Sequence, residues 1–312
     1  MAQRDPETYG TIVTRPDDFA AFWDETLADL ARVPLNVECH EAPLRSTADV
    51  VTYDVSWSSY QHLRIAGWLC VPRTAGPHPG LLVFPGYVSE PLVPRAWARE
   101  GYAALSVAVR GKLRSNRHFN PGYPGLLTYN IVDRETYGYR GLYCDAWRGV
   151  DVLRTLPWVD GSRIGATGSS QGGALTMLTA AMRPEVVAAA AGAPYLTGMA
   201  DAIQLTSSYP YQEINDYLRL YPERQPVVEH TLRYFDVLNF APIVQCPVLL
   251  NIGLQDDVCP PETGYALIEA LRCPKDLHAY DQAGHDAGEA RHGPLLRRFL
   301  AQHLKPASLH QE

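Results

Sequence analysis

The sequence predicts an α/β fold with a mostly parallel central sheet and helices on both faces. Apolar runs at residues 80–84, 102–109, 163–167 and 246–253 alternate with helical patterns along the chain. These runs are too continuous for strands with one face in water, and they are typical of parallel strands that are buried on both sides. An N-terminal helix and an antiparallel hairpin at one edge of the sheet complete the predicted fold.

The first part of the chain predicts that helix and that hairpin. Residues 17–32 place apolar side chains at helical spacing behind an acidic start, which is the pattern of an amphipathic helix. Residues 50–57 and 63–71 alternate between apolar and polar side chains and are separated by a short polar link. This alternation predicts two antiparallel strands at the edge of the sheet.

Further helices and strands follow the hairpin. Residues 138–156 predict a long helix that carries Leu142, Ala146, Val150 and Leu153 on one face. A turn is predicted at 158–161, helices at 174–182, 262–271 and 292–304, and strands at 184–193 and 276–280.

Two segments show no clear period. Residues 110–137 are rich in Gly, Pro, Asn and Tyr and predict a long loop near the carboxyl ends of the strands, where loops of open parallel sheets form binding sites. Arg110, at the start of this loop, is expected to pair with a carboxylate and to hold the loop. Residues 196–240 are irregular and aromatic. They predict an insertion near the active site, and they fit a fold over the site and an oligomer contact equally well.

Length and composition limit the function. Residues 1–312 are expected to form a single domain, with 46% apolar residues to fill its core. The net charge of −7 and the absence of a Lys or Arg run disfavour nucleic acid as a partner. The N-terminus lacks the apolar stretch of a secretory signal, and no window approaches 18 continuous apolar residues. We therefore expect a soluble, cytoplasmic protein without a membrane partner.

The cysteines predict neither disulfides nor a metal centre. Six cysteines are scattered along the chain without a CxxC pair. In a chain with a full-sized core, this pattern favours free thiols over a disulfide framework. None of them is spaced for zinc, so no metal is expected.

A GxSxG motif stands between a strand-like run and a helical run of small and apolar residues. It consists of Gly168, Ser169, Ser170, Gln171 and Gly172. Such a strand-to-helix turn holds its central residue in a strained conformation, and only small neighbours let strand and helix approach so closely. The motif alone fits a simple turn equally well. With the apolar strand before it and suitable partners after it, Ser170 becomes the candidate nucleophile.

Partners for this serine follow in the order acid, then histidine. Asp256 and Asp257 follow an apolar strand directly, where a carboxylate can reach an imidazole from the same sheet edge. His285 follows the last strand on a glycine turn and is the candidate general base. Spacing alone does not choose between the two aspartates. His278 and His118 are weaker candidates for the base.

Two backbone N–H groups are candidates for an oxyanion hole. In serine hydrolases of this architecture, one donor comes from the residue after the nucleophile and one from the loop after an earlier strand. These positions are Gln171 and Tyr87, the latter in the turn that follows residues 80–84. Hydrolysis by such a site needs no metal or organic cofactor.

The chain resembles carbohydrate esterases of the acetyl xylan esterase and cephalosporin C deacetylase type, a branch of the α/β-hydrolases. The segment GLQDDVCPPET at 253–263 carries a pattern that is much more specific than GxSxG. The resembling motifs span nearly the whole chain and include FWDETL near the N-terminus, PGY at 85–87, YGYRGLYCDAWRGVDVL at 137–153, VDGSRIGATGSSQGG at 159–173, YQEINDYL at 211–218, TLRYFDVLNFA at 231–241 and GHDAG at 284–288.

The resemblance implies an α/β-hydrolase fold and assigns each role. Ser170 corresponds to the nucleophile, Asp256 to the acid and His285 to the base, with the amides of Tyr87 and Gln171 as the oxyanion hole. The first aspartate is favoured because the family's acid stands three places before the CPP. The resemblance also implies deacetylation of small acetylated sugars and related esters such as cephalosporin C. It further implies a homo-oligomer, commonly a hexamer.

The chain departs from the family pattern around the expected pocket. The family usually has Gly at the position of Ser169, Gln at that of Lys112 and Glu at that of Asp286. Residues 88–91 replace the family's Gly-rich run. None of these changes removes a catalytic group, so they bear on the substrate more than on the chemistry.

Two other functions fit the same residues. A peptidase, or an esterase for bulkier acids, would keep the triad and differ in the pocket, which residues 110–137 and 196–240 are expected to build. The other is a hydrolase-like scaffold that only binds; a missing member of the triad would favour it, and all three members are present.

Overall fold

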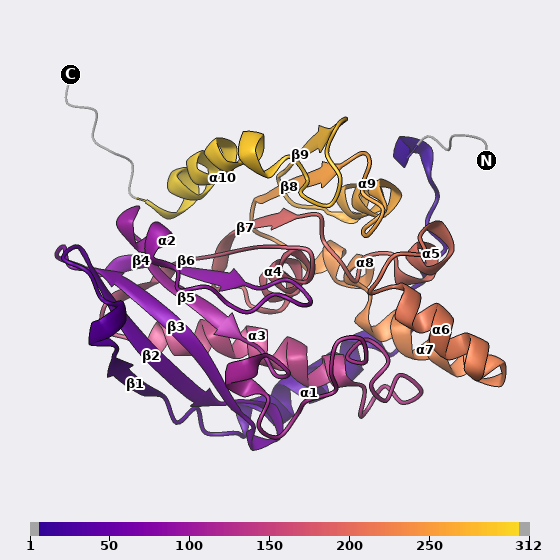
Figure 1. The fold of residues 1–312 in the computed structure, drawn as a ribbon, viewed down its shortest axis with the longest axis horizontal. Helices are drawn as coiled ribbons and strands as arrows, with labels where there is room; N and C mark the ends of the chain where they lie inside the picture. Colours follow the sequence, from indigo (N-terminus) through magenta and orange to yellow (C-terminus); the bar gives the residue numbers. More distant parts are fainter. Residues whose placement is uncertain (1–5, 306–312) are drawn as a thin grey trace.

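A nine-stranded sheet forms the centre of the protein and carries helices on both faces (Figure 1). The computed structural model describes residues 6–305. The first three strands in sheet order run antiparallel to their neighbours, and the others pair in parallel. The predicted α/β class is confirmed. From edge to edge the strands are β1 (Glu38–Glu41), β2 (Val50–Ser58), β3 (Arg64–Pro72), β5 (Ala103–Ala108), β4 (His78–Phe84), β6 (Val159–Ser169), β7 (Val186–Gly192), β8 (Val248–Gly253) and β9 (Lys275–Tyr280).

Helices cover the two faces unequally. One face packs against a large apolar cluster that contains side chains of α1 (Phe19–Ala31), α3 (Gly138–Thr155), α4 (Gln171–Met182) and α9 (Pro261–Ala270). The opposite face is covered by α2 (Arg95–Arg99) and α10 (Glu289–Leu304). The predicted N-terminal, long central and C-terminal helices are therefore confirmed, with ends shifted by a few residues.

The central strands are apolar on both sides, as the sequence pattern predicts. In β7, Ala189 and Ala191 belong to the core of one face. Ala188 and Ala190 belong to the core of the other. Both α4 and α10 contact this strand, and its small side chains leave room for two helices. The buried middle of the sheet keeps the carboxyl ends of β4, β6 and β8 in a fixed arrangement.

Three expectations need correction. The hairpin of β2 and β3 is not the sheet edge, because the short charged strand β1 pairs antiparallel with β2 outside it. A short, charged edge strand discourages pairing with other chains, and its sequence has no apolar period to detect. The turn predicted at residues 158–161 lies mostly within β6, which begins at Val159. Helix α3 is buried on nearly all sides rather than on one face.

The segment at 196–240 is largely helical, although its sequence shows no helical period. It forms α5 (Met199–Leu205), α6 (Gln212–Leu220), α7 (Gln225–Phe235) and α8 (Val237–Phe240). Each helix is short, and tyrosines such as Tyr211 and Tyr234 are buried among residues from distant parts of the chain. Tertiary packing therefore stabilises these helices, and packing of this kind leaves little periodicity in the sequence.

The loop predicted at 110–137 is confirmed. Apart from a short 3-10 helix, Leu113–Ser115, it contains no helix or strand. All six cysteines are free thiols, as predicted. No helix within residues 6–305 combines the length and the apolar character needed to cross a membrane.

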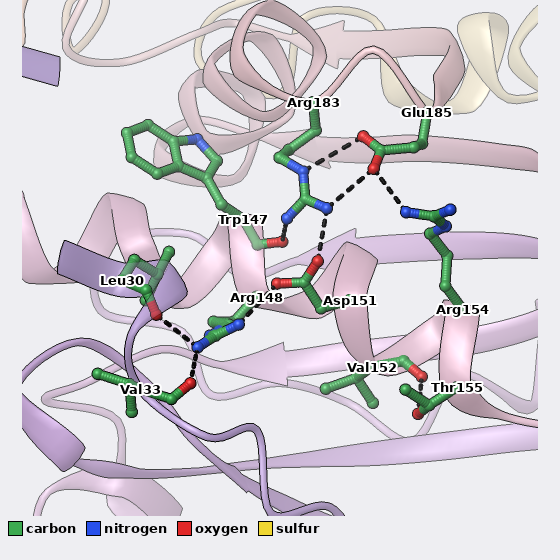
Figure 2. A network of polar contacts seen from close by, with 10 residues as sticks. All are labelled: Leu30, Val33, Trp147, Arg148, Asp151, Val152, Arg154, Thr155, Arg183 and Glu185. Carbon is green, nitrogen blue, oxygen red and sulfur yellow. Dashed lines mark hydrogen bonds and ion pairs between the residues drawn. The ribbon is translucent and has the colours of Figure 1, made fainter. Parts of the chain in front are cut away.

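Charged side chains of α3 belong to a polar network that joins three segments (Figure 2). Asp151 accepts hydrogen bonds from Arg183 at 2.5 Å and from Arg148 at 3.0 Å. The Arg148 guanidinium also donates to the carbonyl of Leu30 at 2.6 Å and to that of Val33. These contacts hold the end of α1 and the end of α4 against α3.

A second buried pair fixes the start of the long loop. Arg110 Nε and Nη2 donate to the two carboxylate oxygens of Asp145 at 2.8 and 2.9 Å, and the Arg110 backbone N–H donates at 2.9 Å. Both side chains are nearly inaccessible, with 3% and 0% exposure. A Cβ atom on Gly141 would lie 1.8 Å from the guanidinium, so α3 leaves space for it only through a glycine. The predicted structural role of Arg110 is confirmed.

We predict that Asp145→Asn lowers the free energy of unfolding by about 3–5 kcal/mol, because it leaves the buried Arg110 charge unpaired. The matched control is Asp49→Asn, which breaks the exposed pair between Arg99 and Asp49 and should cost no more than about 1 kcal/mol. Urea unfolding followed by circular dichroism measures both. Equal losses in the two variants would contradict this account of the loop.

Candidate active site

The GxSxG motif forms a sharp turn between β6 and α4. Ser170 has φ 57° and ψ −122°, a backbone conformation that side-chain-bearing residues rarely adopt. A Cβ atom on Gly168 would lie 2.6 Å from the backbone of Gly172, and one on Gly172 would lie 2.3 Å from the carbonyl oxygen of Phe84. The turn therefore needs glycine at both positions, as the motif predicts.

The backbone of Ser170 is held by β7 and the loop that follows it. Its N–H donates to the carbonyl of Gly192 at 2.9 Å. Its carbonyl accepts from the N–H groups of Ala174 at 3.0 Å and Tyr195 at 3.1 Å. These bonds fix the strained residue in place, with its side chain half-buried at the carboxyl end of the sheet.

Asp256 and His285 form a carboxylate–imidazole pair. His285 Nδ1 lies 2.9 Å from Asp256 Oδ2, and the Asp256 side chain is 1% exposed whereas the His285 ring is 31% exposed. The other carboxylate oxygen accepts the N–H groups of Val258 and Cys259, each at 2.8 Å. With Nδ1 bound to the carboxylate, Nε2 of the imidazole is left to exchange a proton.

The serine is linked to this pair through a residue that the sequence reasoning missed. The Ser170 hydroxyl contacts the Cys259 thiol, and the ligand atoms of Asp256, Cys259 and His285 all lie within 4.8 Å of one another. No hydrogen bond among the described residues joins Ser170 to His285 directly. The structure thus places the three predicted residues in one cluster, with the thiol beside the hydroxyl. Hydrogen bonds between catalytic groups are often long before substrate binds.

The Cys259 thiol is unsuited to act as a nucleophile. Burial raises its pKa well above the usual value, and the Asp256 charge raises it further, whereas the Ser170 hydroxyl lowers it. The thiol therefore stays protonated at neutral pH, and only the thiolate is strongly nucleophilic. The CPP sequence that contains it was visible, but the sequence did not indicate a contact with Ser170.

Asp256, Cys259 and His285 also have the ligand types that hold zinc. Within residues 6–305 they are the one group whose ligand atoms are close enough for a metal ion. The carboxylate and the imidazole are already joined by a hydrogen bond. A bound cation would have to break that bond, so these residues fit proton transfer better than metal binding.

The backbone N–H groups of Tyr87 and Gln171 are both free of partners within the described chain. Phe84, three residues before Tyr87, pairs in register with Gly168, two residues before the serine. Tyr87 and Gln171 are both buried. A buried N–H without a partner is rare in folded proteins. Both N–H groups are therefore free to donate to the oxygen of a ligand.

The side chain of Tyr87 joins the site to the two segments without sequence period. Its hydroxyl donates to Glu213 Oε1 of α6 at 2.7 Å and accepts the N–H of Leu127 at 3.0 Å. Glu213 Oε2 accepts the N–H of Gly125 at 2.8 Å. Burial raises the pKa of Glu213 above its usual value. Glu213 is a second site residue that sequence reasoning missed, because its partners lie far away along the chain.

The weaker candidates lie outside this cluster. Asp257 is exposed, and its carboxylate accepts the Ser208 hydroxyl at 3.3 Å. His118 is exposed in the long loop. The His278 ring lies beside that of His292, with 5.5 Å between ring centroids. None of the three takes part in the carboxylate–imidazole pair.

Comparisons with known sequences find acetyl esterases. A family model described as acetyl xylan esterase (AXE1) matches residues 2–303. The curated protein "Acetyl esterase Axe7A" of Xylanibacter ruminicola is 30% identical over 287 residues, which cover 87% of this chain and 64% of that protein. The chain thus spans less than two thirds of the length of this relative.

Solved structures extend the comparison. An acetyl xylan esterase from Paenibacillus sp. R4 has a TM-score of 0.91 at 31% identity, covering 97% of this chain and 100% of the other. Acetyl xylan esterase 1 from a Thermoanaerobacterium species has a TM-score of 0.90 at 28% identity, covering 98% and 99%. An acylaminoacyl peptidase from Pyrococcus horikoshii, at 16% identity and a TM-score of 0.62 over 85% of this chain and 50% of the other, shares only the fold.

We predict that Gly172→Ala displaces the loop after β4, because the added Cβ would lie 2.3 Å from the Phe84 carbonyl oxygen. The expected cost is about 1–3 kcal/mol of stability, with labelling of Ser170 by a fluorophosphonate probe slowed by about 10²-fold. Gly10→Ala is the control, since a Cβ atom there meets nothing within 4 Å. Labelling of Gly172→Ala at the wild-type rate would show that the close approach is not required.

Proposed function

Because the chain belongs to the acetyl xylan esterase family, we propose that it is a serine esterase that removes acetyl groups from acetylated xylo-oligosaccharides and related small acetyl esters. The observation that carries this proposal is the strained Ser170 turn beside the bonded pair of Asp256 and His285. The free N–H groups of Tyr87 and Gln171 support it.

In the proposed reaction, Ser170 Oγ attacks the acetyl carbonyl carbon while His285 Nε2 takes the hydroxyl proton. The imidazolium then returns this proton to the departing sugar alcohol as the carbon–oxygen bond breaks. A water molecule attacks the acetyl-serine with His285 again as the base, which releases acetate and restores the serine. Asp256 orients the imidazole and stabilises its charged form throughout.

The N–H groups of Tyr87 and Gln171 are proposed to bind the oxygen that becomes negative during each attack. Both belong to rigid backbone at the point where β4 and β6 end, so no rearrangement is needed as charge develops. One such donor contributes roughly 3 kcal/mol of transition-state stabilisation in a comparable hydrolase. Neither the formation nor the hydrolysis of the acetyl-serine requires a metal or an organic cofactor.

Acetyl esters are proposed as substrates because of the family and the names of its relatives. Cephalosporin C is proposed as a further substrate from the sequence resemblance alone.

We propose that residues 196–240 form one wall of the pocket within a single domain, and the bond between Glu213 and Tyr87 supports this. The same segment exposes Leu220 (74%), Tyr221 (39%) and Val227 (39%), which supports a homo-oligomer, proposed from the resemblance to be a hexamer.

We predict that Ser170→Ala lowers the kcat for hydrolysis of p-nitrophenyl acetate by at least about 10³-fold, because the nucleophile is lost. Ser169→Ala, which truncates the exposed neighbour in the same turn, is the matched control and should retain activity. Circular dichroism of both variants should match the wild type. Wild-type turnover by Ser170→Ala would refute the assignment.

A panel of esters tests the substrate class. We predict the highest kcat/KM for acetyl esters, including acetylated xylo-oligosaccharides and cephalosporin C, with a decrease as the acyl chain lengthens, because longer acyl groups need a wider pocket. Activity that rises with chain length, or cleavage of acylated peptides, would instead favour an esterase for bulkier acids or a peptidase.

A further inference from the structure

A fully buried lysine lies directly behind the turn that carries the oxyanion donor. Lys112 is 0% exposed and follows β5 in the long loop. Its Nζ donates to the carbonyl oxygen of Gly86 at 2.8 Å and also to that of Tyr87. The ammonium group therefore holds two successive carbonyls of the turn after β4.

No carboxylate of the described residues lies within ion-pair distance of this cation, and Glu90 acts on its charge only from farther away. None of the ion pairs formed within residues 6–305 includes Lys112. The ring of Tyr123 lies beneath it, with Nζ 4.8 Å from the ring centroid. Backbone carbonyls and an aromatic face are weak compensation for removing an ammonium group from water. A neutral side chain would suit this position better if it served packing alone.

The geometry of the peptide group connects Lys112 to catalysis. The Gly86 carbonyl and the Tyr87 N–H belong to one planar peptide unit, which is trans in this structure. Its C=O and N–H bonds point in opposite directions. A cation fixed on the oxygen therefore sets the plane of the peptide and directs the N–H away from Lys112. It also draws electron density toward the oxygen, which makes the N–H a stronger donor.

We propose that Lys112 is a positioning residue of the oxyanion hole, which aims and polarises the Tyr87 N–H and whose positive charge stabilises the oxyanion in the transition state. This inference rests on the proposed function, since it requires attack on an ester by Ser170. Lys112 acts through the Gly86–Tyr87 peptide and does not touch substrate.

The charge of Lys112 is sensitive to pH. Burial lowers the pKa of its ammonium group to about 8, although the Glu90 carboxylate acts in the opposite direction. The other titratable groups that face this region are the hydroxyls of Tyr123 and Tyr87, and Glu213 of α6, which binds the Tyr87 hydroxyl. The two hydroxyls stay protonated because burial raises their pKa values. The active form carries the ammonium, so the contribution of Lys112 to activity is fully present below its pKa and is lost as pH rises through it.

Three substitutions separate charge from hydrogen bonding. Lys112→Gln keeps a donor and removes the charge, Lys112→Met removes both, and Lys112→Arg keeps a charge that does not titrate. The control is Lys275→Gln, which removes an exposed ammonium that also donates to backbone carbonyls, including Leu271 at 2.7 Å, but on β9. Hydrolysis of phenyl acetate is followed from about pH 6 to about pH 10, a range that spans the lysine transition.

We expect a wild-type kcat/KM that falls above about pH 8. Lys112→Gln should lower kcat by roughly tenfold with KM changed less than about twofold, because a unit charge near the developing oxyanion is lost. It should also lose the alkaline decline. Lys112→Arg should retain most activity and show no alkaline decline up to about pH 10, because its charge does not titrate in this range. Lys275→Gln should match the wild type.

A direct titration measures the pKa of the Lys112 ammonium in the wild-type protein, even if a Lys112 variant fails to fold. The chain has only three lysines, Lys112, Lys275 and Lys305, so the ¹³Cε signals of labelled lysine can be assigned by substitution. One signal should titrate near the pH at which kcat/KM falls, and its midpoint should rise when a phosphonate anion occupies Ser170. A wild-type pH profile in folded Lys112→Gln, or no signal titrating in step with activity, would overturn the role of Lys112. Turnover by Ser170→Ala would instead overturn the proposed function itself.

Discussion

The close backbone approach at the start of α4 is the constraint on which the site depends. Gly172 touches the end of β4, and Gly168 touches Gly172, with no space for a Cβ atom at either position. This contact brings the serine turn and the turn after β4 together, so that one turn presents the hydroxyl and the other presents an N–H group. The strain at Ser170 is held by bonds to β7 and its following loop. The continuous core on both faces of the sheet gives the rigidity that such strain requires.

Much of this arrangement could be predicted from the sequence because it depends on local patterns. The unbroken apolar runs required a sheet that is buried on both faces, and the strand ends then determined where Ser170, Asp256 and His285 could meet. The glycines of the serine motif predicted a close approach of strand and helix, and the structure shows this approach at Gly168 and Gly172. Arg110 was expected to be structural, and its partner proved to be Asp145.

Other parts of the site could not be predicted, since they depend on contacts between distant residues. Nothing near Glu213 in the sequence indicates a bond to Tyr87, which lies 126 positions away. Cys259 looked like one more scattered thiol until its contact with Ser170 was known. The short helices of 196–240 and the charged strand β1 lack the periodicity that identifies longer elements. The sequence showed Lys112 as a departure from the family pattern, but it did not show that this side chain is buried.

The bonds around Tyr87 have a consequence for how such a site can change over generations. Glu213 uses both carboxylate oxygens, one for the Tyr87 hydroxyl and one for the Gly125 amide, so α6, the long loop and the turn after β4 meet at a single acid. A replacement at position 213 without an acceptor would leave the buried Tyr87 hydroxyl and the partly buried Gly125 N–H unsatisfied at once. Changes in these three segments are therefore coupled through one acid, whereas the exposed side chains of Val88 and Leu113 can change without disturbing these bonds.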